Sequence, residues 1–369
     1  MTSRLENLKM IISKDLYKKS TLGLLLCSER SGSNLLRCIF DAHPQIFAPN
    51  TMALSFLWEE IDKLTYKINC LGWNKLVAET ARRINESTFY TGVSVTIMEL
   101  HQHILVNDIA GLYIYPYLKG LIQYDANFII IKEHQAWRIA PYFLKYFPKA
   151  KIIAQIRDPR DHAVSCKKLR KLYASYHGSL IRALKMWKID QKELLLLQKK
   201  FGKDVVRIHK YEELINNPQV TLKGICKFLN IECSELMMRY YIFQAEKKKY
   251  APNYLHKMWA NLDKPLSPKS INQWKNSLKK YELEAIENEL TPLMHELGYT
   301  PVCSTNNKFK TIFFKIGSSI RYYSVSFLIW LTWVIATQDY SVSLSVILGK
   351  AVRAHLPYER FRDRIGYSL

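Results

Sequence analysis

The chain has 369 residues, of which 48% are hydrophobic and 23% are charged, an ordinary globular composition with room for a sizeable core. Lys and Arg number 54 against 32 Asp and Glu, so the formal net charge is +22. This excess indicates an anionic partner: nucleic acid, an acidic membrane surface, a phosphorylated nucleotide or a sulfated polymer. The charge alone does not choose among these classes.

The cysteines argue against a metal site. They are odd in number, and none stands in a CxxC or Cys/His spacing typical of zinc. The first twenty residues contain no apolar secretory core. We therefore expect reduced thiols, a cytoplasmic protein and no bound metal. The seven cysteines are Cys27, Cys38, Cys70, Cys166, Cys226, Cys233 and Cys303.

The first motif with chemical content follows an apolar run at residues 21–27. This run, Thr-Leu-Gly-Leu-Leu-Leu-Cys, predicts a strand buried on both faces of a parallel sheet. Residues 28–34 form a polar loop, and apolar side chains then recur at helical spacing. At such a strand–loop–helix junction, the free backbone N–H groups and the helix dipole favour a phosphate.

The loop carries the residue types that an anion needs. Gly32 permits close approach of the backbone, and Arg30 supplies the charge that a leaving phosphate requires. Further hydrogen bonds are expected from Ser31, Ser33 and Asn34. The loop lacks the GxxxxGK[ST] pattern of nucleoside triphosphate kinases. The alternative is an ordinary polar loop between a strand and a helix.

Further along the chain, strands alternate with helices. Apolar runs predict strands at residues 128–132, 151–156 and 205–209, and the longest helical pattern covers residues 180–200. This alternation predicts a doubly wound parallel sheet in a three-layer α/β fold. Residues 54–120 carry helical patterns without a strong motif, and we expect residues 52–125 to form most of the walls of a binding pocket.

A second motif stands at the end of the strand at residues 151–156. Arg157 ends that strand, Asp158 is suited to cap the next helix, and Pro159 is suited to open it. Ser165 follows the cap by seven residues, nearly two helical turns or about 10 Å along the axis. Arg157 and Ser165 can therefore bind one phosphate against the side of this helix. A surface arginine and a solvated serine are the alternative.

Together the two motifs resemble the donor-binding elements of sulfotransferases that use 3′-phosphoadenosine 5′-phosphosulfate (PAPS). Residues 30–33 are similar to the family's first element, and residues 157–165 are similar to its second. Three further segments are similar to the family: residues 41–44, 211–218 and 264–301.

The resemblance implies a fold related to the P-loop kinases and in-line transfer of a sulfuryl group to an acceptor hydroxyl. Such a transfer needs a base on one side of the reacting group and a cation on the other, without a metal. The resemblance also implies that Tyr211 contacts the adenine and that Lys264 returns to the nucleotide phosphates. A core tyrosine and a solvated lysine are the respective alternatives.

The catalytic base takes one of two forms in this family. Members that act on glycans and proteins often carry a glutamate after the first helix, where this chain has Thr51, which cannot act as a base. Cytosolic small-molecule members carry Lys-x-His at the end of the second strand, and Lys132-Glu133-His134 stands there. The resemblance therefore makes His134 the base and Lys132 the residue that stabilises the transferring sulfuryl group or the bridging oxygen.

Other bases stay open. Glu133 could be the base, with His134 lining the acceptor pocket. Glu59 or Glu60 could also reach the site if the intervening loop folds back. A histidine that is merely hydrogen-bonded at a strand end is the remaining alternative.

Residues 306–369 differ in character from the domain predicted for residues 1–305. Aromatic and apolar side chains fill residues 313–347, with Lys and Arg on both sides. The uninterrupted apolar stretch has about fifteen residues, fewer than the roughly 20 that a spanning helix needs. A buried helix and an interfacial segment on an anionic membrane both stay open.

Two other functions fit part of the sequence. A P-loop small-molecule kinase would share the fold, but the chain lacks the Walker lysine and a clear pair of Mg²⁺-binding acids. A membrane-associated, non-catalytic nucleotide-binding protein would explain the charge and the apolar tail. Nucleic acid is not an expected partner, because no module that reads it is present. The sequence does not specify whether the acceptor hydroxyl lies on a glycan, a lipid, a peptide or a small molecule.

Overall fold

The computed structural model describes residues 21–58, 72–133, 135–172, 180–249 and 261–303. Two compact units share the chain. The first holds Met1–Asp158 and Asp190–Asn272, and the second holds Pro159–Ile189 and Gln273–Leu369. The segment of residues 306–369, predicted as a C-terminal extension, lies outside the described residues.

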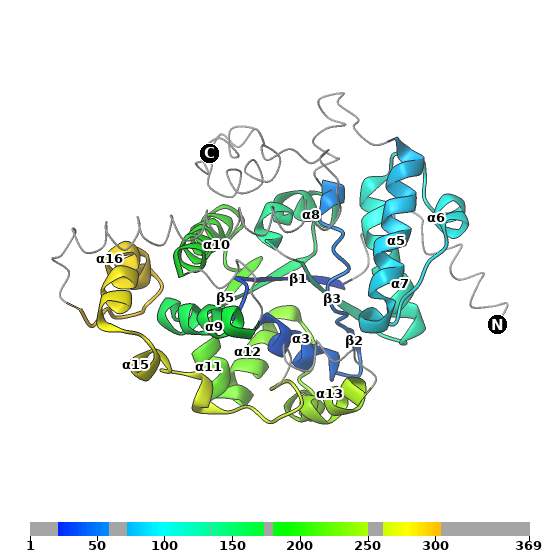
Figure 1. The fold of residues 1–369 in the computed structure, drawn as a ribbon. Helices are drawn as coiled ribbons and strands as arrows, with labels where there is room; N and C mark the ends of the chain where they lie inside the picture. The colour runs from blue at the N-terminus through cyan, green and yellow to red at the C-terminus, as the bar shows by residue number, and fades with distance from the viewer. Residues whose placement is uncertain (1–20, 59–71, 134, 173–179, 250–260, 304–369) are drawn as a thin grey trace. The chain divides into compact units, whose positions relative to one another are not determined.

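A parallel sheet of five strands forms the centre of the first unit (Figure 1). Its order is β2-β3-β1-β4-β5, so the chain builds one side of β1 first and then crosses to the other side. This confirms the predicted doubly wound sheet, in which ligands bind beyond the carboxyl ends of the strands where the order reverses. The strands are β1 (Thr21–Cys27), β2 (Ile46–Phe47), β3 (Phe128–Lys132), β4 (Lys151–Ile156) and β5 (Val206–Lys210).

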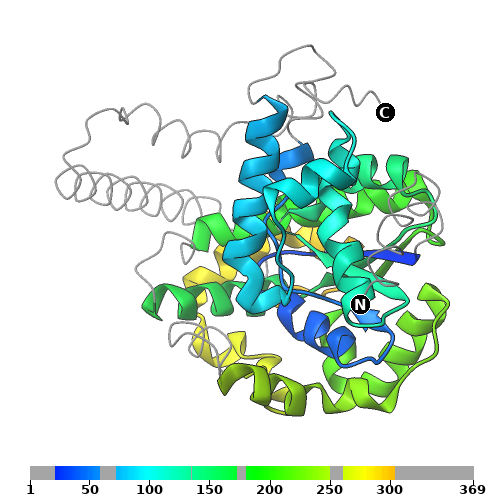
Figure 2. The ribbon, with the colours of Figure 1, turned by 90° about the vertical axis from the view of Figure 1, so that its right-hand side faces the viewer.

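Helices cover both faces of this sheet, as Figures 1 and 2 show. Every residue of β3 is buried, as expected for a strand with helices on both sides. One face packs its apolar side chains against α3 (Ser33–Asp41), α11 (Tyr211–Asn216), α12 (Pro218–Leu229) and the 3₁₀ turn η3 (Glu235–Arg239). The opposite face carries α7 (Ile109–Gln123), α8 (Ala140–Tyr146) and the last part of α10 (Leu180–Phe201).

Three described helices, α5, α6 and α7, lie between residues 72 and 125, in the region where the sequence predicts helical walls. The region begins with the longest of them, α5, which contacts both α6 and α7. The first unit also contains the helix α13 and the 3₁₀ turn η4. The bounds are α5 (Trp73–Thr91), α6 (Ile97–His103), α13 (Tyr240–Lys249) and the 3₁₀ turn η4 (Pro268–Ser270).

The second unit is helical in its described part. Its helices are α9 (Pro159–Leu172), the first ten residues of α10, α15 (Trp274–Ser277) and α16 (Lys280–Glu296). A buried ion pair joins α9 to α16, because Arg160 Nη1 lies 2.8 Å from Glu287 Oε1. Asp161 accepts a hydrogen bond at 3.0 Å from the backbone N–H of Trp274 and so joins α9 to α15.

Most predicted elements lie where the sequence places them. The predicted strands at residues 21–27, 128–132 and 151–156 agree with the structure to the residue. The next strand is shifted by one residue, and the two-residue β2 was not predicted. Among the described residues, no helix combines the length and the apolar character needed to cross a membrane.

Candidate active site

The loop between β1 and α3 turns sharply at two residues. Arg30 has φ 67° and Gly32 has φ 88°, and the backbone N–H of Ser31 donates to the carbonyl of Ser28 at 3.1 Å. Gly32 is the N-cap of α3, so no side chain caps the helix there. The first-turn N–H groups of α3 are therefore available to an anion.

Two polar side chains of this loop fit such a ligand. Ser31 Oγ and Asn34 Oδ1 are buried and make no hydrogen bond to the described residues. Buried polar atoms of this kind are costly unless a partner satisfies them. The carbonyl of Ser31 is held in place by Gln155 Nε2 at 2.7 Å. A phosphate or sulfate group at the uncapped helix end would accept hydrogen bonds from the Ser31 hydroxyl and from the first-turn N–H groups of α3.

Arg157 joins this loop to two other segments of the first unit. Its Nη1 donates to the carbonyl of Arg30 at 2.9 Å, and its Nη2 donates to the carbonyl of Ser270 at 2.7 Å. The guanidinium carbon lies 4.6 Å from the centre of the Tyr211 ring. The structure thus brings together Arg30, Arg157 and Tyr211, which the sequence assigned to one donor site.

Tyr211 lies between the loop and the core. Its side chain is buried, and its hydroxyl donates to Ser270 Oγ at 2.8 Å. An added Cβ at Gly32 would lie only 2.6 Å from the Tyr211 ring, so the loop packs directly on this tyrosine. Its contact with adenine stays a prediction. Sequence reasoning missed Ser270, since a serine in a polar stretch gives no signal before the fold places it.

The other predicted donor residues are less closely tied to this loop. Lys264 has an exposed side chain, and its carbonyl accepts from the Tyr240 hydroxyl at 2.7 Å. Ser165 lies on α9 in the second unit, and its pairing with Arg157 stays a prediction.

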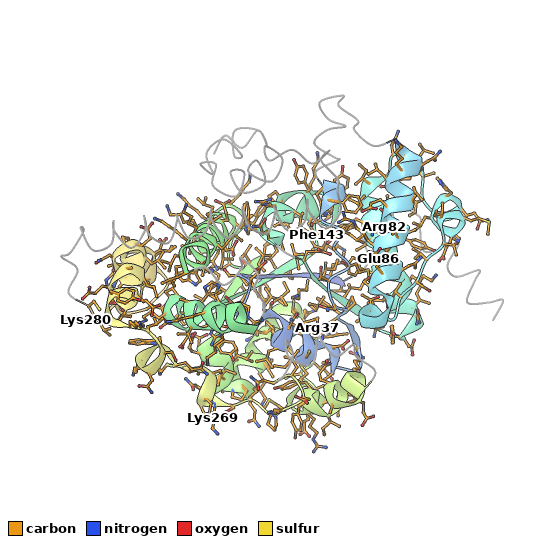
Figure 3. All side chains as sticks on the ribbon, viewed as in Figure 1. Arg37, Arg82, Glu86, Phe143, Lys269 and Lys280 are labelled. Carbon is orange, nitrogen blue, oxygen red and sulfur yellow. The ribbon has the colours of Figure 1, made fainter. Side chains whose placement is uncertain are left out.

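A buried lysine ends β3. Lys132 is only 8% exposed, and burial together with the positive charge of Arg37 lowers the pKa of its amine to about 8. Arg37 lies on α3 (Figure 3), and its Nη1 donates to the carbonyl of Ala48 at 2.9 Å. This bond fixes the segment that leads from α3 toward Thr51.

Glu133 binds that same segment from the other side. It is 4% exposed, and it accepts hydrogen bonds from Thr51 Oγ1 at 3.1 Å, Tyr117 Oη at 3.1 Å and the backbone N–H of Leu54 at 3.4 Å. Burial raises the pKa of the Glu133 carboxyl. Ala53, within this segment, has φ 55°, a conformation that costs energy for a residue with a Cβ. Glu133 thus holds in place the residues where the family's glutamate is expected.

Three candidate bases, His134, Glu59 and Glu60, lie outside the described residues. Among the residues that are described, no group of three His, Cys, Asp or Glu side chains could hold a metal ion.

Comparisons with known proteins agree with this arrangement. A model of the sulfotransferase family matches residues 24–235. The protein-tyrosine sulfotransferase 1 of Danio rerio is 20% identical over 286 residues, which cover 75% of this chain and 72% of that protein. A putative protein-tyrosine sulfotransferase of Caenorhabditis briggsae is 24% identical over 275 residues, which cover 73% of this chain and 86% of that protein.

A solved structure shares the fold. The sulfotransferase domain of the olefin synthase from Synechococcus PCC 7002 is 19% identical, with a TM-score of 0.50. The match covers 76% of this chain and 94% of that chain. At this identity the likeness shows a common fold.

Proposed function

Because the chain belongs to the sulfotransferase family, we propose that it transfers a sulfuryl group from PAPS to a hydroxyl group of an acceptor. The observation that carries this proposal is the contact of Arg157 with the β1–α3 loop, at an uncapped helix end where the buried Ser31 hydroxyl has no hydrogen-bond partner among the described residues. PAPS supplies the activated sulfuryl group, and the family implies its use as co-substrate.

The chain's own residues would divide the work of donor binding. The N–H groups at the start of α3, with Ser31, Ser33 and Asn34, would bind phosphate oxygens. Arg30 would neutralise the leaving phosphate, and Arg157 would fix the loop that carries it. Ser165, Tyr211 and Lys264 remain proposed donor contacts.

Residues at and after the end of β3 would stabilise the transferring sulfuryl group and activate the acceptor hydroxyl. The Lys132 amine is a compact cation that would stabilise negative charge on the transferring group. We retain His134 as the proposed base, which would take the proton from the acceptor hydroxyl as that oxygen attacks sulfur. Glu133 would hold residues 51–54 in place, since three hydrogen bonds already engage its carboxyl group.

The acceptor is proposed from the relatives' names alone. Several relatives are named as protein-tyrosine sulfotransferases, so a tyrosine peptide is the first acceptor to test. Glycan, lipid and small hydroxyl compounds form the other members of the panel.

The basic and aromatic segment of residues 306–369 supports a peripheral location on an anionic membrane. Deletion of that segment should then abolish binding to anionic vesicles while nucleotide binding persists.

The decisive experiment combines binding with transfer. Calorimetry should show that adenosine 3′,5′-bisphosphate binds far more tightly than ATP. A P-loop kinase would instead bind ATP more tightly than the bisphosphate. Radiolabelled sulfate should then move from PAPS to a member of the acceptor panel, in the absence of added metal. Tight binding without transfer to any acceptor would favour a non-catalytic nucleotide-binding protein.

A further inference from the structure

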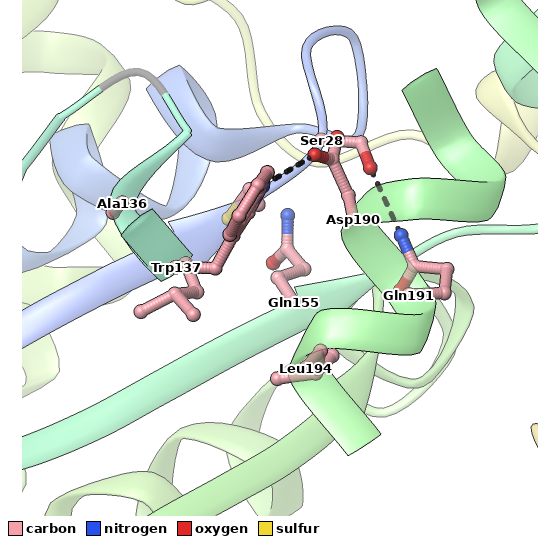
Figure 4. Close-up of a pocket in the computed structure, with 9 residues that line it drawn as sticks. Ser28, Ala136, Trp137, Gln155, Asp190, Gln191 and Leu194 are labelled. Atoms are coloured by element: carbon pink, nitrogen blue, oxygen red, sulfur yellow. Dashed lines mark hydrogen bonds between the residues drawn. The ribbon is translucent and has the colours of Figure 1, made fainter. Parts of the chain in front are cut away.

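A buried carboxylate connects the donor loop to the segment that follows β3. Asp190 lies on α10 and is 7% exposed. Its Oδ1 accepts a hydrogen bond from the indole N–H of Trp137 at 2.8 Å (Figure 4). The Ser28 hydroxyl, which lines the same small cavity as Asp190, hydrogen-bonds to the Asp190 carboxylate and partly offsets the rise in its pKa that burial causes. Ser28 begins the donor loop, and Trp137 lies in the 3₁₀ turn η1 (Ala136–Arg138), just after the stretch with Lys132.

The neighbouring residue of α10 holds the same serine. Gln191 Nε2 donates to Ser28 Oγ at 2.9 Å, and the carbonyl of Ser28 closes the turn of the loop by accepting from Ser31 N–H at 3.1 Å. Ser28 is 1% exposed, so no bulk water replaces these bonds. Two successive residues of α10 therefore fix the point at which the donor loop leaves β1.

A small cavity adjoins this cluster. Its volume is about 10 Å³, close to the space that one water molecule needs, and Gln155 and Leu194 help to line it. Gln191 Oε1 is buried there without a hydrogen bond to the described residues. The cluster is thus well packed and has room for little more than a water, which suits a supporting role rather than a substrate pocket.

The surroundings of Asp190 shift the pKa of its carboxyl. Burial raises the pKa of its carboxyl to about 7, and the hydrogen bonds from Ser28 and Trp137 only partly offset this effect. Of the neighbouring charges, Glu29 raises that pKa further and Arg138 lowers it. Burial also raises the pKa of the Cys27 thiol to about 12, so this thiol stays neutral while Asp190 titrates.

We propose that Asp190 is a positioning residue for sulfuryl transfer, which holds the donor loop through Ser28 and the segment after β3 through Trp137. The inference rests on the proposed function, because it assigns Asp190 to the same donor site. An ionised carboxylate accepts both hydrogen bonds, whereas an asparagine presents an NH₂ group to one of them. In Asp190→Asn the amide NH₂ group would face Ser28 Oγ, so the Ser28 hydroxyl would lose its acceptor and the start of the loop would be held only by the Gln191 and Ser31 bonds.

The first test observes the hydrogen bond itself. The protein has eight tryptophans, and selective nitrogen-15 labelling gives one indole N–H resonance for each. Trp137→Phe identifies the Trp137 resonance. We expect that resonance to titrate with a midpoint near pH 7 in the wild type and to show no such titration in Asp190→Asn. Adenosine 3′,5′-bisphosphate should shift it in the wild type, because the nucleotide loop and Trp137 share Asp190.

The second test measures transfer. Asp190→Asn should raise the KM for PAPS by about tenfold. The loss of one hydrogen bond to a buried charged group weakens binding by about this factor. Ser28→Ala and Trp137→Phe each remove one of the two bonds and should each show part of the effect. If Asp190→Asn does not fold, these two variants carry the test alone.

The outcomes separate this inference from the proposed function. A wild-type Trp137 resonance that titrates as expected, in a protein that binds no bisphosphate, would reject the proposed donor site. Binding of bisphosphate without any change in the Trp137 resonance would overturn the role of Asp190 while leaving the donor site intact. An unchanged KM for PAPS in all three variants would overturn it as well.

Discussion

Arg157 Nη1 donates to the backbone carbonyl of Arg30 at 2.9 Å, so the end of β4 is bound directly to the loop after β1. The two residues are far apart in sequence, and each belongs to one of the two motifs from which the donor site was predicted. The bond uses the carbonyl of Arg30, whereas the proposed role in binding the donor belongs to its guanidinium.

Substitution of Arg157 should weaken nucleotide binding in proportion to the bonds lost. Arg157→Ala removes two bonds to carbonyl groups, and we expect the Kd for adenosine 3′,5′-bisphosphate to rise about a hundredfold. Arg157→Lys keeps the charge but loses the forked geometry, so a rise of about tenfold is expected. Calorimetry measures both.

Arg82→Ala is the matched control for this substitution. Arg82 is an exposed arginine on α5 that pairs with Glu86 (Figure 3). Its loss should leave the Kd unchanged, since exposed pairs contribute little to stability. Equal Kd values for Arg157→Ala and Arg82→Ala would contradict the assignment of Arg157 to the donor site.

Gly32 offers a second test of the donor loop. Alanine at this position would be strained by φ 88°, and its Cβ would lie 2.6 Å from the Tyr211 ring and 2.8 Å from Gln155 Nε2. Gly202 has a similar φ of 83°, but among the described residues, its two chain neighbours aside, no heavy atom lies within 4 Å of its Cβ position. Both variants should therefore lose about 1 kcal/mol to backbone strain. Only Gly32→Ala should also weaken bisphosphate binding, by at least tenfold, and equal binding in the two variants would show that the loop is not the donor site.

The lowered pKa of Lys132 predicts how the activity falls along the alkaline limb of the pH profile. Its pKa is lowered to about 8, so its amine is charged below that pH and loses its charge above it. If the cation stabilises the transferring group, kcat/KM for PAPS falls as the pH rises through about 8. Lys132→Arg keeps its charge throughout, so its lower activity should lack this limb, while Lys132→Met should be weakly active at every pH. A limb near pH 8 that persists in Lys132→Arg would assign the titration to another group.

The base can be assigned by comparing two neighbouring residues. His134→Ala should abolish turnover while bisphosphate binding persists, since the proposed base does not hold the donor. Glu133→Gln should keep measurable turnover and lose stability, because an amide NH₂ group would face the donors of Thr51, Tyr117 and Leu54. Activity assays and thermal unfolding distinguish these results. A folded Glu133→Gln that binds bisphosphate without turnover would make Glu133 the base.

The sequence predicts the sheet better than the site because the two depend on different information. The runs that became β1, β3 and β4 are apolar without interruption, and burial on both faces of a parallel sheet requires that pattern. The two residues of β2 are too few to form a pattern. Arg30 and Arg157 could be predicted because each ends or follows a buried strand. Ser270 and Asp190 could not, since they reach the site only through tertiary packing.

The last prediction concerns the second unit, where Glu287 is fully buried. It accepts from Arg160 Nη1 at 2.8 Å and from the backbone N–H groups of Val302 at 3.0 Å and Cys303 at 2.7 Å. Glu287→Gln would leave the Arg160 charge buried without its counter-charge, and we expect the free energy of unfolding to fall by about 3–5 kcal/mol. Glu289→Gln is the matched control, because Glu289 pairs with Lys188 at 2.5 Å at a partly exposed site and should lose less than about 1 kcal/mol. Urea unfolding of both variants measures the difference, and a similar loss in the two would mean that the buried pair contributes no more than a surface pair.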